Sequence, residues 1–206
     1  MKVDGKSFRT IWPSDNGESV EIIDQTRLPH DFVTVKLKTL EEVAEAIRKM
    51  MVRGAPLIGA AGAYGICLGL QEDASDSGLD RGYETLVATR PTGTNLRWAL
   101  DDMQDRLRPL HPEKRLEAAY KRAAEICDED VAINGSIGEH GLNVICGLRA
   151  GRAGKDKDHP VNILTHCNAG WLATVDKGTA LAPVYRAHDS GIPVHVWVDE
   201  TRPRNQ

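Results

Sequence analysis

The residue best suited to chemistry is Cys167, in the stretch THCNAG, where an apolar run gives way to small residues. Small residues in such a turn leave backbone amides exposed, and these surroundings favour a reactive thiol. A cysteine packed beneath the turn is the structural alternative. A Cys-His hydrolase arrangement is less favoured, because neighbouring side chains on a strand, here His166 and Cys167, point to opposite faces.

A second polar group, DETRP, follows a short run of branched and aromatic residues near the end of the sequence. Asp199 and Glu200 have the side chains of general acids and bases. The same carboxylates are equally suited to holding Arg202 or the loop in place. The sequence leaves both readings open.

Two loops combine an arginine with small residues directly before a predicted helix. In RGAP, Arg53 precedes Gly54 and Ala55, with proline at the first helical position. In TRPTGTN, Arg90 precedes the next such start. Free amides at a helix N-terminus beside a guanidinium form an anion site suited to a phosphate. Each loop alone is also compatible with a merely structural turn, but the pair favours a phosphorylated ligand.

The elements that must position the thiol form a βαβ unit. A strand over Val161–His166, read as buried on both faces, leads to a helix over Thr179–Ser190 and a strand over Val194–Val198. The crossover makes the strands parallel, so their carboxyl ends share one rim, about 5 Å apart if the strands are neighbours. Two parallel strands do not form an independent sheet, so this unit is expected to be the front portion of a domain.

The rest of the sequence predicts a mainly helical N-terminal part. Its first 37 residues contain alternating segments typical of a small antiparallel sheet, and Thr39 with Glu42 forms a capping box that opens a helix. The glycines of the next helix, Gly62, Gly65 and Gly69, predict close approach of another backbone. Further predictions are a solvated loop over 71–82, a helix over 96–107 and a long helical region over 112–148 with a break near Asn134-Gly135. We therefore expect an α/β fold with a helical domain at 1–150, a linker at 151–160 and the start of a Rossmann-like domain at 161–206.

Composition excludes several classes of protein. The chain has 206 residues, 41% of them hydrophobic, a net charge of −4 and a pI near 6.0. This charge gives no broad reason to bind nucleic acid or an anionic membrane, and no apolar run is long enough to span a bilayer. The expected location is the cytoplasm. The histidines lack metal-ligand spacing, and the four cysteines contain no CxxC pair, so neither a metal site nor a disulfide framework is predicted. Cys67, Cys127 and Cys146 are expected to pack as small apolar residues.

Taken together, RGAP, GAAGAYG, TRPTGTN, THCNAG, GTAL and VDETRPRNQ resemble the methylthioribose-1-phosphate isomerase family of methionine salvage. The resemblance runs from about Thr39 to Gln206. Relatives of the same fold include ribose-1,5-bisphosphate isomerases and the regulatory subunits of eukaryotic translation initiation factor two-B.

The resemblance implies conversion of 5-methylthioribose 1-phosphate to 5-methylthioribulose 1-phosphate, without cofactor or metal. It implies that Arg53, Gly54, Ala55, Arg90 and Gln206 bind the sugar phosphate. Cys167 matches the catalytic thiol of the family. A homodimer is likewise expected from the resemblance alone.

One part of the family pattern has no match in this sequence. The family's catalytic Asp follows the position of Gln206, so the resemblance implies an incomplete enzyme whose remainder lies on a continuation or a second chain. Isomerisation of ribose 1,5-bisphosphate is an alternative that would need a cationic pocket in place of an apolar one. A non-catalytic regulatory or interaction module of the same fold is the other alternative.

Overall fold

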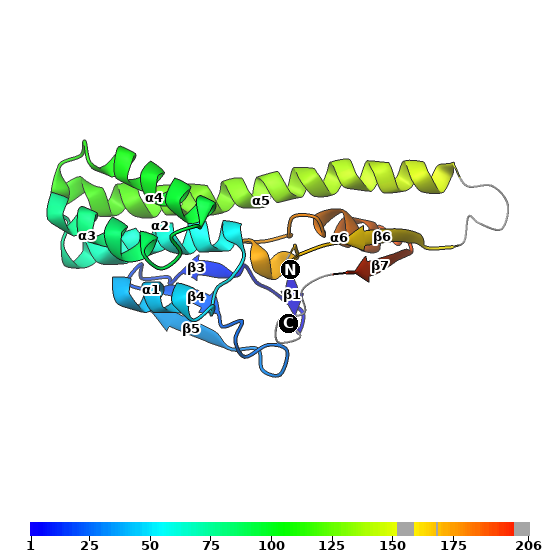
Figure 1. Ribbon diagram of the computed structural model, residues 1–206, viewed down its shortest axis with the longest axis horizontal. Coiled ribbons are helices and arrows are strands. Elements are labelled where there is room, and N and C mark those ends of the chain that lie inside the picture. The colour runs from blue at the N-terminus through cyan, green and yellow to red at the C-terminus, as the bar shows by residue number, and fades with distance from the viewer. Residues whose placement is uncertain (152–158, 168, 200–206) are drawn as a thin grey trace.

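The computed structural model describes residues 1–151, 159–167 and 169–199. A bundle of helices packs on a small antiparallel sheet, and a parallel pair of strands lies beneath the second half of a long helix (Figure 1). The strands are β1 (Lys2–Val3), β2 (Lys6–Ser7), β3 (Ile11–Pro13), β4 (Val20–Ile23), β5 (Thr34–Leu37), β6 (Val161–Thr165) and β7 (Val194–Val198). The helices are α1 (Leu40–Arg48), α2 (Ala55–Glu72), α3 (Asp76–Val87), α4 (Thr94–Leu107), α5 (Pro112–Ala150), the 3-10 turn η2 (Trp171–Ala173) and α6 (Ala182–Asp189).

The expected antiparallel sheet is present in the order β3-β4-β5, with Ile22 opposite Ile11 and Val20 opposite Leu37. The capping box that opens α1 is also confirmed. The Glu42 amide donates to Thr39 Oγ1 at 3.1 Å, and the Thr39 amide donates to the Glu42 carboxylate at 3.3 Å. This sheet and α1 form the floor on which α2 packs.

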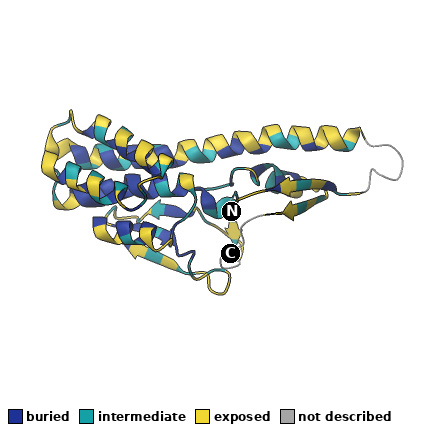
Figure 2. Cartoon of the chain, viewed as in Figure 1, coloured by how far each residue is buried: buried dark blue, intermediate teal, exposed yellow. Residues whose placement is uncertain are grey.

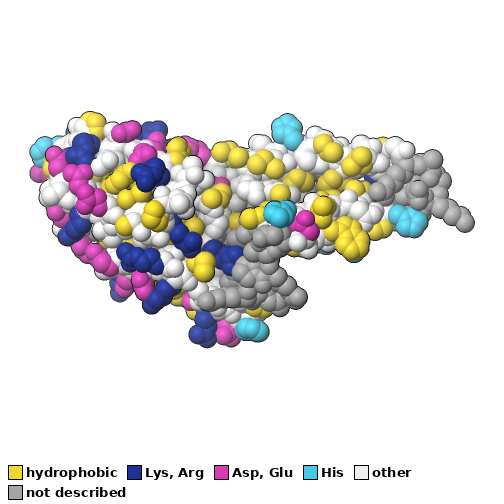
Figure 3. Space-filling view, viewed as in Figure 1, with side chains coloured by type: hydrophobic (Ala, Val, Ile, Leu, Met, Phe, Trp, Pro, Cys, Tyr) yellow, Lys and Arg dark blue, Asp and Glu magenta, His cyan; other side chains and the backbone are white. Residues whose placement is uncertain are grey.

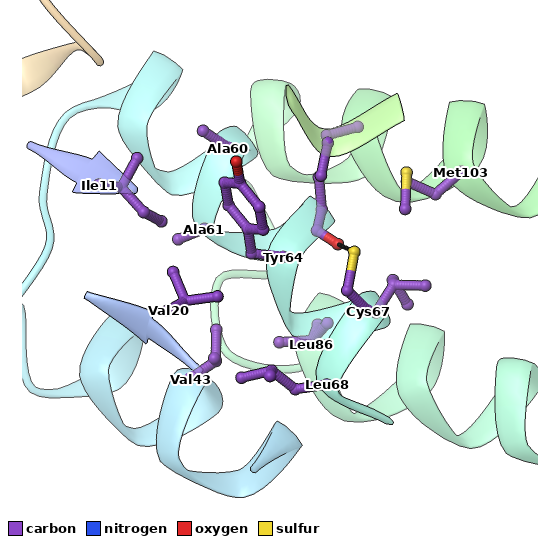
Figure 4. Close-up of a cluster of buried hydrophobic side chains, with 14 of the residues drawn as sticks. Ile11, Val20, Val43, Ala60, Ala61, Tyr64, Cys67, Leu68, Leu86 and Met103 are labelled. Atoms are coloured by element: carbon purple, nitrogen blue, oxygen red, sulfur yellow. Dashed lines mark hydrogen bonds between the residues drawn. The ribbon is translucent and has the colours of Figure 1, made fainter. Parts of the chain in front are cut away.

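Helix α2 runs through the middle of the core and is buried on almost every side. Figure 4 shows side chains of the sheet, α1, α3 and α4 gathered around it. Cys67 and Cys127 are buried, as predicted, and burial raises the pKa of the Cys127 thiol to about 12. Cys146 is exposed, so the prediction that it packs as a small apolar residue is wrong.

Gly62, Gly65 and Gly69 of α2 allow close packing, but against side chains rather than a backbone. A Cβ on Gly62 would lie 2.5 Å from Leu96 Cδ1, and one on Gly65 would lie 2.9 Å from Leu86 Cδ1. The sequence predicted the close approach and mistook its partner.

The predicted loop over 71–82 is wrong, because α3 begins within it. Ser75 caps this helix by accepting a hydrogen bond from the Gly78 amide at 3.2 Å, and Asp76 stands in the first turn, where a carboxylate complements the helix dipole. Leu79 and Leu86, one heptad apart, are fully buried. The acidic and small residues that indicated a loop are in fact the start of a helix.

The predicted break near Asn134-Gly135 is also wrong, because α5 continues for 39 residues. The Asn134 side chain donates from Nδ2 to the Asp130 carbonyl one turn back, at 2.9 Å, within the continuous helix. Gly141, further along, lies against α6, and a Cβ there would lie 2.2 Å from Pro183 Cγ. Glycine in this helix therefore serves contact with α6 rather than interruption of α5.

The predicted βαβ unit is confirmed as a parallel pair. Val161 is paired with Val194 and Thr165 with Val198, and α6 connects the strands. Burial of β6 on both faces is not observed: Leu164 is 68% exposed, and no described residue covers that side of the pair. Figures 2 and 3 show this exposed apolar surface together with one along the outer side of α5. The fold is mixed α/β. The division into a helical domain at 1–150, a linker at 151–160 and the start of a second domain at 161 stays a prediction.

Arg115 secures the junction of α3, α4 and α5 from a buried position, with 3% of its side chain exposed. It also pairs with Asp76. Its guanidinium donates to the backbone carbonyls of Ala74, Leu107, Arg108 and Leu110. These carbonyls lie at helix ends and in the connecting turns, where helical hydrogen bonds do not reach them.

We predict that Arg115→Met lowers the free energy of unfolding by about 3 kcal/mol, because it removes the buried donor that these four carbonyls share. Urea denaturation measures the change. Lys114→Met, one residue earlier and exposed, is the matched control and should change stability by less than about 0.5 kcal/mol. Equal effects of the two substitutions would contradict the structural role of Arg115.

Candidate active site

The two predicted anion loops lie at the same end of the helical bundle. Gly59 of α2 lies against Asn95 at the start of α4, and Gly62 lies one turn further along against Leu96. The two helices therefore run in the same direction, with their N-termini side by side (Figure 1). Each begins after a glycine, Gly54 or Gly93, and neither has a side-chain cap. Their first amides and the positive ends of both helix dipoles therefore point to one region.

Each loop also holds its arginine beside the helix start. Arg53 directly precedes the glycine at the start of α2 and is half-buried. Arg90 is half-buried too, and its carbonyl accepts a hydrogen bond from the Gly93 amide at 2.9 Å, which closes the turn before α4. Ala55 is exposed at the first position of α2. These residues have the chemistry of an anion site, and their role in binding stays a prediction.

Gly54 is the point where the helical part meets the segment after β6. Its φ of 97° lies in the region that favours glycine, and a Cβ there would lie 2.3 Å from the Cα of Ala173. The contact is with backbone, which cannot swing aside as a flexible side chain can. Glycine is therefore required both by the local conformation and by this approach.

Hydrogen bonds from the N-terminal sheet region hold the same segment in place. The Gln25 side chain donates to the Leu172 carbonyl at 2.7 Å. Thr10 Oγ1 donates to the Thr174 carbonyl at 2.6 Å, and the Thr10 amide donates to the Val175 carbonyl at 3.0 Å. These bonds fix the segment after the THCNAG turn against the loop that contains Arg53.

Asp130 of α5 completes this attachment from the other side. Its carboxylate accepts hydrogen bonds from the Val175 amide at 2.8 Å and the Asn134 side chain at 3.0 Å. Burial raises the pKa of the Asp130 carboxyl, against the lowering effect of these two hydrogen bonds. Further along the segment, the Thr179 amide donates to the Ala169 carbonyl at 3.2 Å, which links GTAL to the turn after Cys167.

The carboxyl ends of β6 and β7 meet as predicted. The Asp199 amide donates to the Thr165 carbonyl at 3.3 Å, and His166 Nδ1 lies 3.0 Å from Asp199 Oδ1. Cys167 is exposed, so the packed alternative is wrong. Its φ of 69° takes it out of the extended strand conformation, so the alternation used against a Cys-His arrangement does not apply there.

Sequence reasoning considered His166 only as a possible partner of Cys167 and missed its pairing with Asp199. The signal was present, because His166 ends one predicted strand and Asp199 directly follows the other, and the two strands were predicted to be parallel neighbours. Gln206, Glu200 and Arg202 lie outside the described residues. Within those residues, no group of three or more His, Cys, Asp or Glu side chains is arranged to hold a metal ion.

Two cavities lie near this region. One of about 360 Å³ lies between the starts of α2 and α4 and the middle of α5, and its lining includes Pro56, Asn95, Trp98 and Thr179. The other, of about 510 Å³, is lined by charged residues such as Asp176, and the residues that line either cavity include no predicted site residue. The smaller cavity therefore adjoins both helix starts and the segment that follows Cys167. No helix in the described part of the chain is long and apolar enough to cross a membrane.

Comparison with known proteins gives a consistent result. Residues 51–206 match the model of the Initiation factor 2 subunit family. Methylthioribose-1-phosphate isomerase of Rhodospirillum rubrum is 61% identical over the whole chain, which covers 53% of that protein. The enzyme of Escherichia coli O45:K1 is 58% identical, with 55% of its length covered. The chain thus spans about half the length of the curated relatives it matches.

Two solved structures share the fold. The 5-methylthioribose 1-phosphate isomerase of Pyrococcus horikoshii matches 96% of this chain with a TM-score of 0.79 and 38% identity, and 54% of that structure is covered. Subunit delta of translation initiation factor eIF-2B from A. fulgidus matches 97% with a TM-score of 0.77 and 36% identity, with 56% covered. One fold thus accommodates an enzyme and an initiation-factor subunit.

We predict that Gly54→Ala destabilises the protein by more than about 3 kcal/mol, because the new methyl group meets the Ala173 backbone in addition to the unfavourable φ. It should also weaken binding of inorganic phosphate. Thermal unfolding and phosphate titration by calorimetry measure the two effects.

Gly17→Ala is the matched control, because Gly17 has a φ of 69° and nothing lies within 4 Å of the place that a Cβ would occupy. It should cost only about 1 kcal/mol and leave phosphate binding unchanged. If both substitutions had the same effect, the contact with Ala173 would carry no special weight.

Proposed function

Because the chain belongs to the Initiation factor 2 subunit family, whose matched relatives include the isomerases above, we propose that the full-length protein is an aldose–ketose isomerase. The proposed reaction converts 5-methylthioribose 1-phosphate to 5-methylthioribulose 1-phosphate in methionine salvage. Relatives named methylthioribose-1-phosphate isomerase that are 56–61% identical across the whole chain support this choice.

The observation that carries the proposal is the contact of Gly54 with Ala173, which joins the two halves of the proposed site. The uncapped starts of α2 and α4, with Arg53 and Arg90, provide positive charge and amides for the phosphate. The rim of β6 and β7 provides the thiol of Cys167. The Gly54 contact with Ala173 holds the two halves together.

The chemistry assigns a role to each half. The phosphate on C1 blocks simple opening to a free aldehyde, so ring opening must occur with the phosphate retained and bound. We assign that binding to Arg53, Gly54, Ala55, Arg90 and Gln206. The hydrogen at C2 must then move to C1, and we assign assistance of this step to Cys167. A site that excludes water strengthens the electrostatic interactions with the bound phosphate and with the reacting atoms.

The apolar tail of this sugar needs an apolar surface, and the smaller cavity supplies a candidate. Trp98, Ile133 and Ile137 line it, close to the start of α2 at Pro56. A 5-phosphate in place of the methylthio group would instead need cationic partners there. This difference favours the methylthio sugar over ribose 1,5-bisphosphate.

A non-catalytic regulatory role is the second candidate, because the A. fulgidus initiation-factor subunit has the same fold. Assay of the full-length protein with the methylthio sugar phosphate and with ribose 1,5-bisphosphate separates the three functions. Turnover of the first alone is the expected result. Turnover of the bisphosphate alone, or of neither sugar, would overturn the proposal in favour of the corresponding alternative. The homodimer and the cytoplasmic location stay predictions, checked by light scattering and cell fractionation.

We predict that Cys167→Ser in the full-length protein lowers kcat by about 10²-fold or more, since a hydroxyl replaces a far more acidic and nucleophilic thiol. Binding of the sugar phosphate should be kept, because the arginine loops are unchanged. Steady-state kinetics and calorimetry test the two halves of this expectation. Cys146→Ser, at an exposed position on α5, is the control and should leave kcat unaltered. Full turnover by Cys167→Ser would remove the thiol from the mechanism.

A further inference from the structure

The pairing of His166 with Asp199 is a feature that the proposed function does not yet use. The imidazole Nδ1 and the carboxylate Oδ1 are 3.0 Å apart, and the side chains are 68% and 46% exposed. An exposed pair of this kind contributes little to the stability of a fold. Stability of the fold therefore does not account for the His166–Asp199 pair, and a role in binding or chemistry is the alternative.

The carboxylate gives the imidazole a defined orientation. With Nδ1–H donated to Asp199, the ring presents Nε2 away from the pair, as a base when neutral and as a second donor when protonated. The hydrogen bond from the Asp199 amide to the Thr165 carbonyl holds the two strand ends in register. The backbone that carries the His166–Asp199 pair is therefore held in place. This is the arrangement in which a histidine transfers protons.

The position of the pair is next to the proposed catalytic thiol. Cys167 directly follows His166, and its φ of 69° turns the chain out of the extended conformation at that residue. The two side chains are therefore not constrained to opposite faces of a strand. A sugar held beside the thiol has the imidazole within the same short segment.

We propose that His166, oriented by Asp199, is the acid–base group that opens the sugar ring, an inference that rests on the isomerase function proposed above. As the bond from C1 to the ring oxygen breaks, its electron pair stays on that oxygen, which takes the Nε2 proton of the imidazolium. Later the hydrogen at C2 moves to C1 with its bonding electron pair, and the 2-hydroxyl loses its proton to Nε2 as C2 becomes a carbonyl. The ring oxygen has gained one proton and the 2-hydroxyl has lost one, so the imidazolium is regenerated. Asp199 acts through His166 and is a positioning residue.

The test uses the full-length protein and begins with turnover of 5-methylthioribose 1-phosphate by the unchanged enzyme. His166→Ala and His166→Asn should each lower kcat by about 10²–10⁴-fold, with little change in KM. Asparagine can keep a hydrogen bond to Asp199 and cannot transfer the proton, so it separates acid–base chemistry from positioning. Added imidazole should restore part of the activity of His166→Ala. His188→Ala, at an exposed position near the end of α6, is the matched control and should retain full activity.

The outcomes are distinct. If the unchanged enzyme does not turn over the sugar, the proposed function fails and this inference fails with it. If the enzyme is active and His166→Ala is equally active, only the inference fails. Substantial activity in His166→Asn, or no recovery of His166→Ala with imidazole, would assign His166 a positioning role and overturn the acid–base proposal.

Discussion

The contact between Gly54 and Ala173 is the constraint on which the arrangement of the site depends. It brings the start of α2 against backbone that follows the THCNAG turn, two parts of the chain separated by more than a hundred residues. Hydrogen bonds from Thr10, Gln25 and Asp130 hold that backbone from three other parts of the chain. The proposed phosphate loop and the rim that bears the thiol are therefore positioned by one compact junction.

The helices differ in whether a side chain caps their N-terminus. Thr39 and Ser75 close the starts of α1 and α3 with their own hydroxyls, so these helices are complete within the fold. Helices α2 and α4 begin after glycines without such caps, and they run parallel into the same region. The long helix α5, about 58 Å at 1.5 Å per residue, passes from this bundle to α6 and the parallel strands. It joins the two parts without a hinge in its backbone.

Patterns that depend on near neighbours in sequence could be predicted. The capping box at Thr39 and the parallel pairing of β6 with β7 rest on local spacing and on the geometry of a crossover connection. Two errors came from residues with more than one use. Ser75 and Asp76 are typical of loops but equally of helix starts, and glycine in α5 is required for contact with α6. The closeness of Gly54 to Ala173 depends on tertiary packing, which no local spacing encodes. The family resemblance predicted that the loops of Arg53 and Arg90 and the THCNAG turn form the site. Their relative positions became known only from the structure.

The open starts of α2 and α4 have a thermodynamic consequence. A side-chain cap on a helix contributes about 1 kcal/mol of stability, and both helices lack it in the absence of a ligand. An anion bound at these amides would supply the missing interaction only to the folded state. Ligand occupancy and the folding equilibrium are then linked, and the protein gains stability in proportion to the logarithm of ligand concentration above its dissociation constant. The amount of folded protein in the cell would accordingly follow the supply of the phosphorylated ligand.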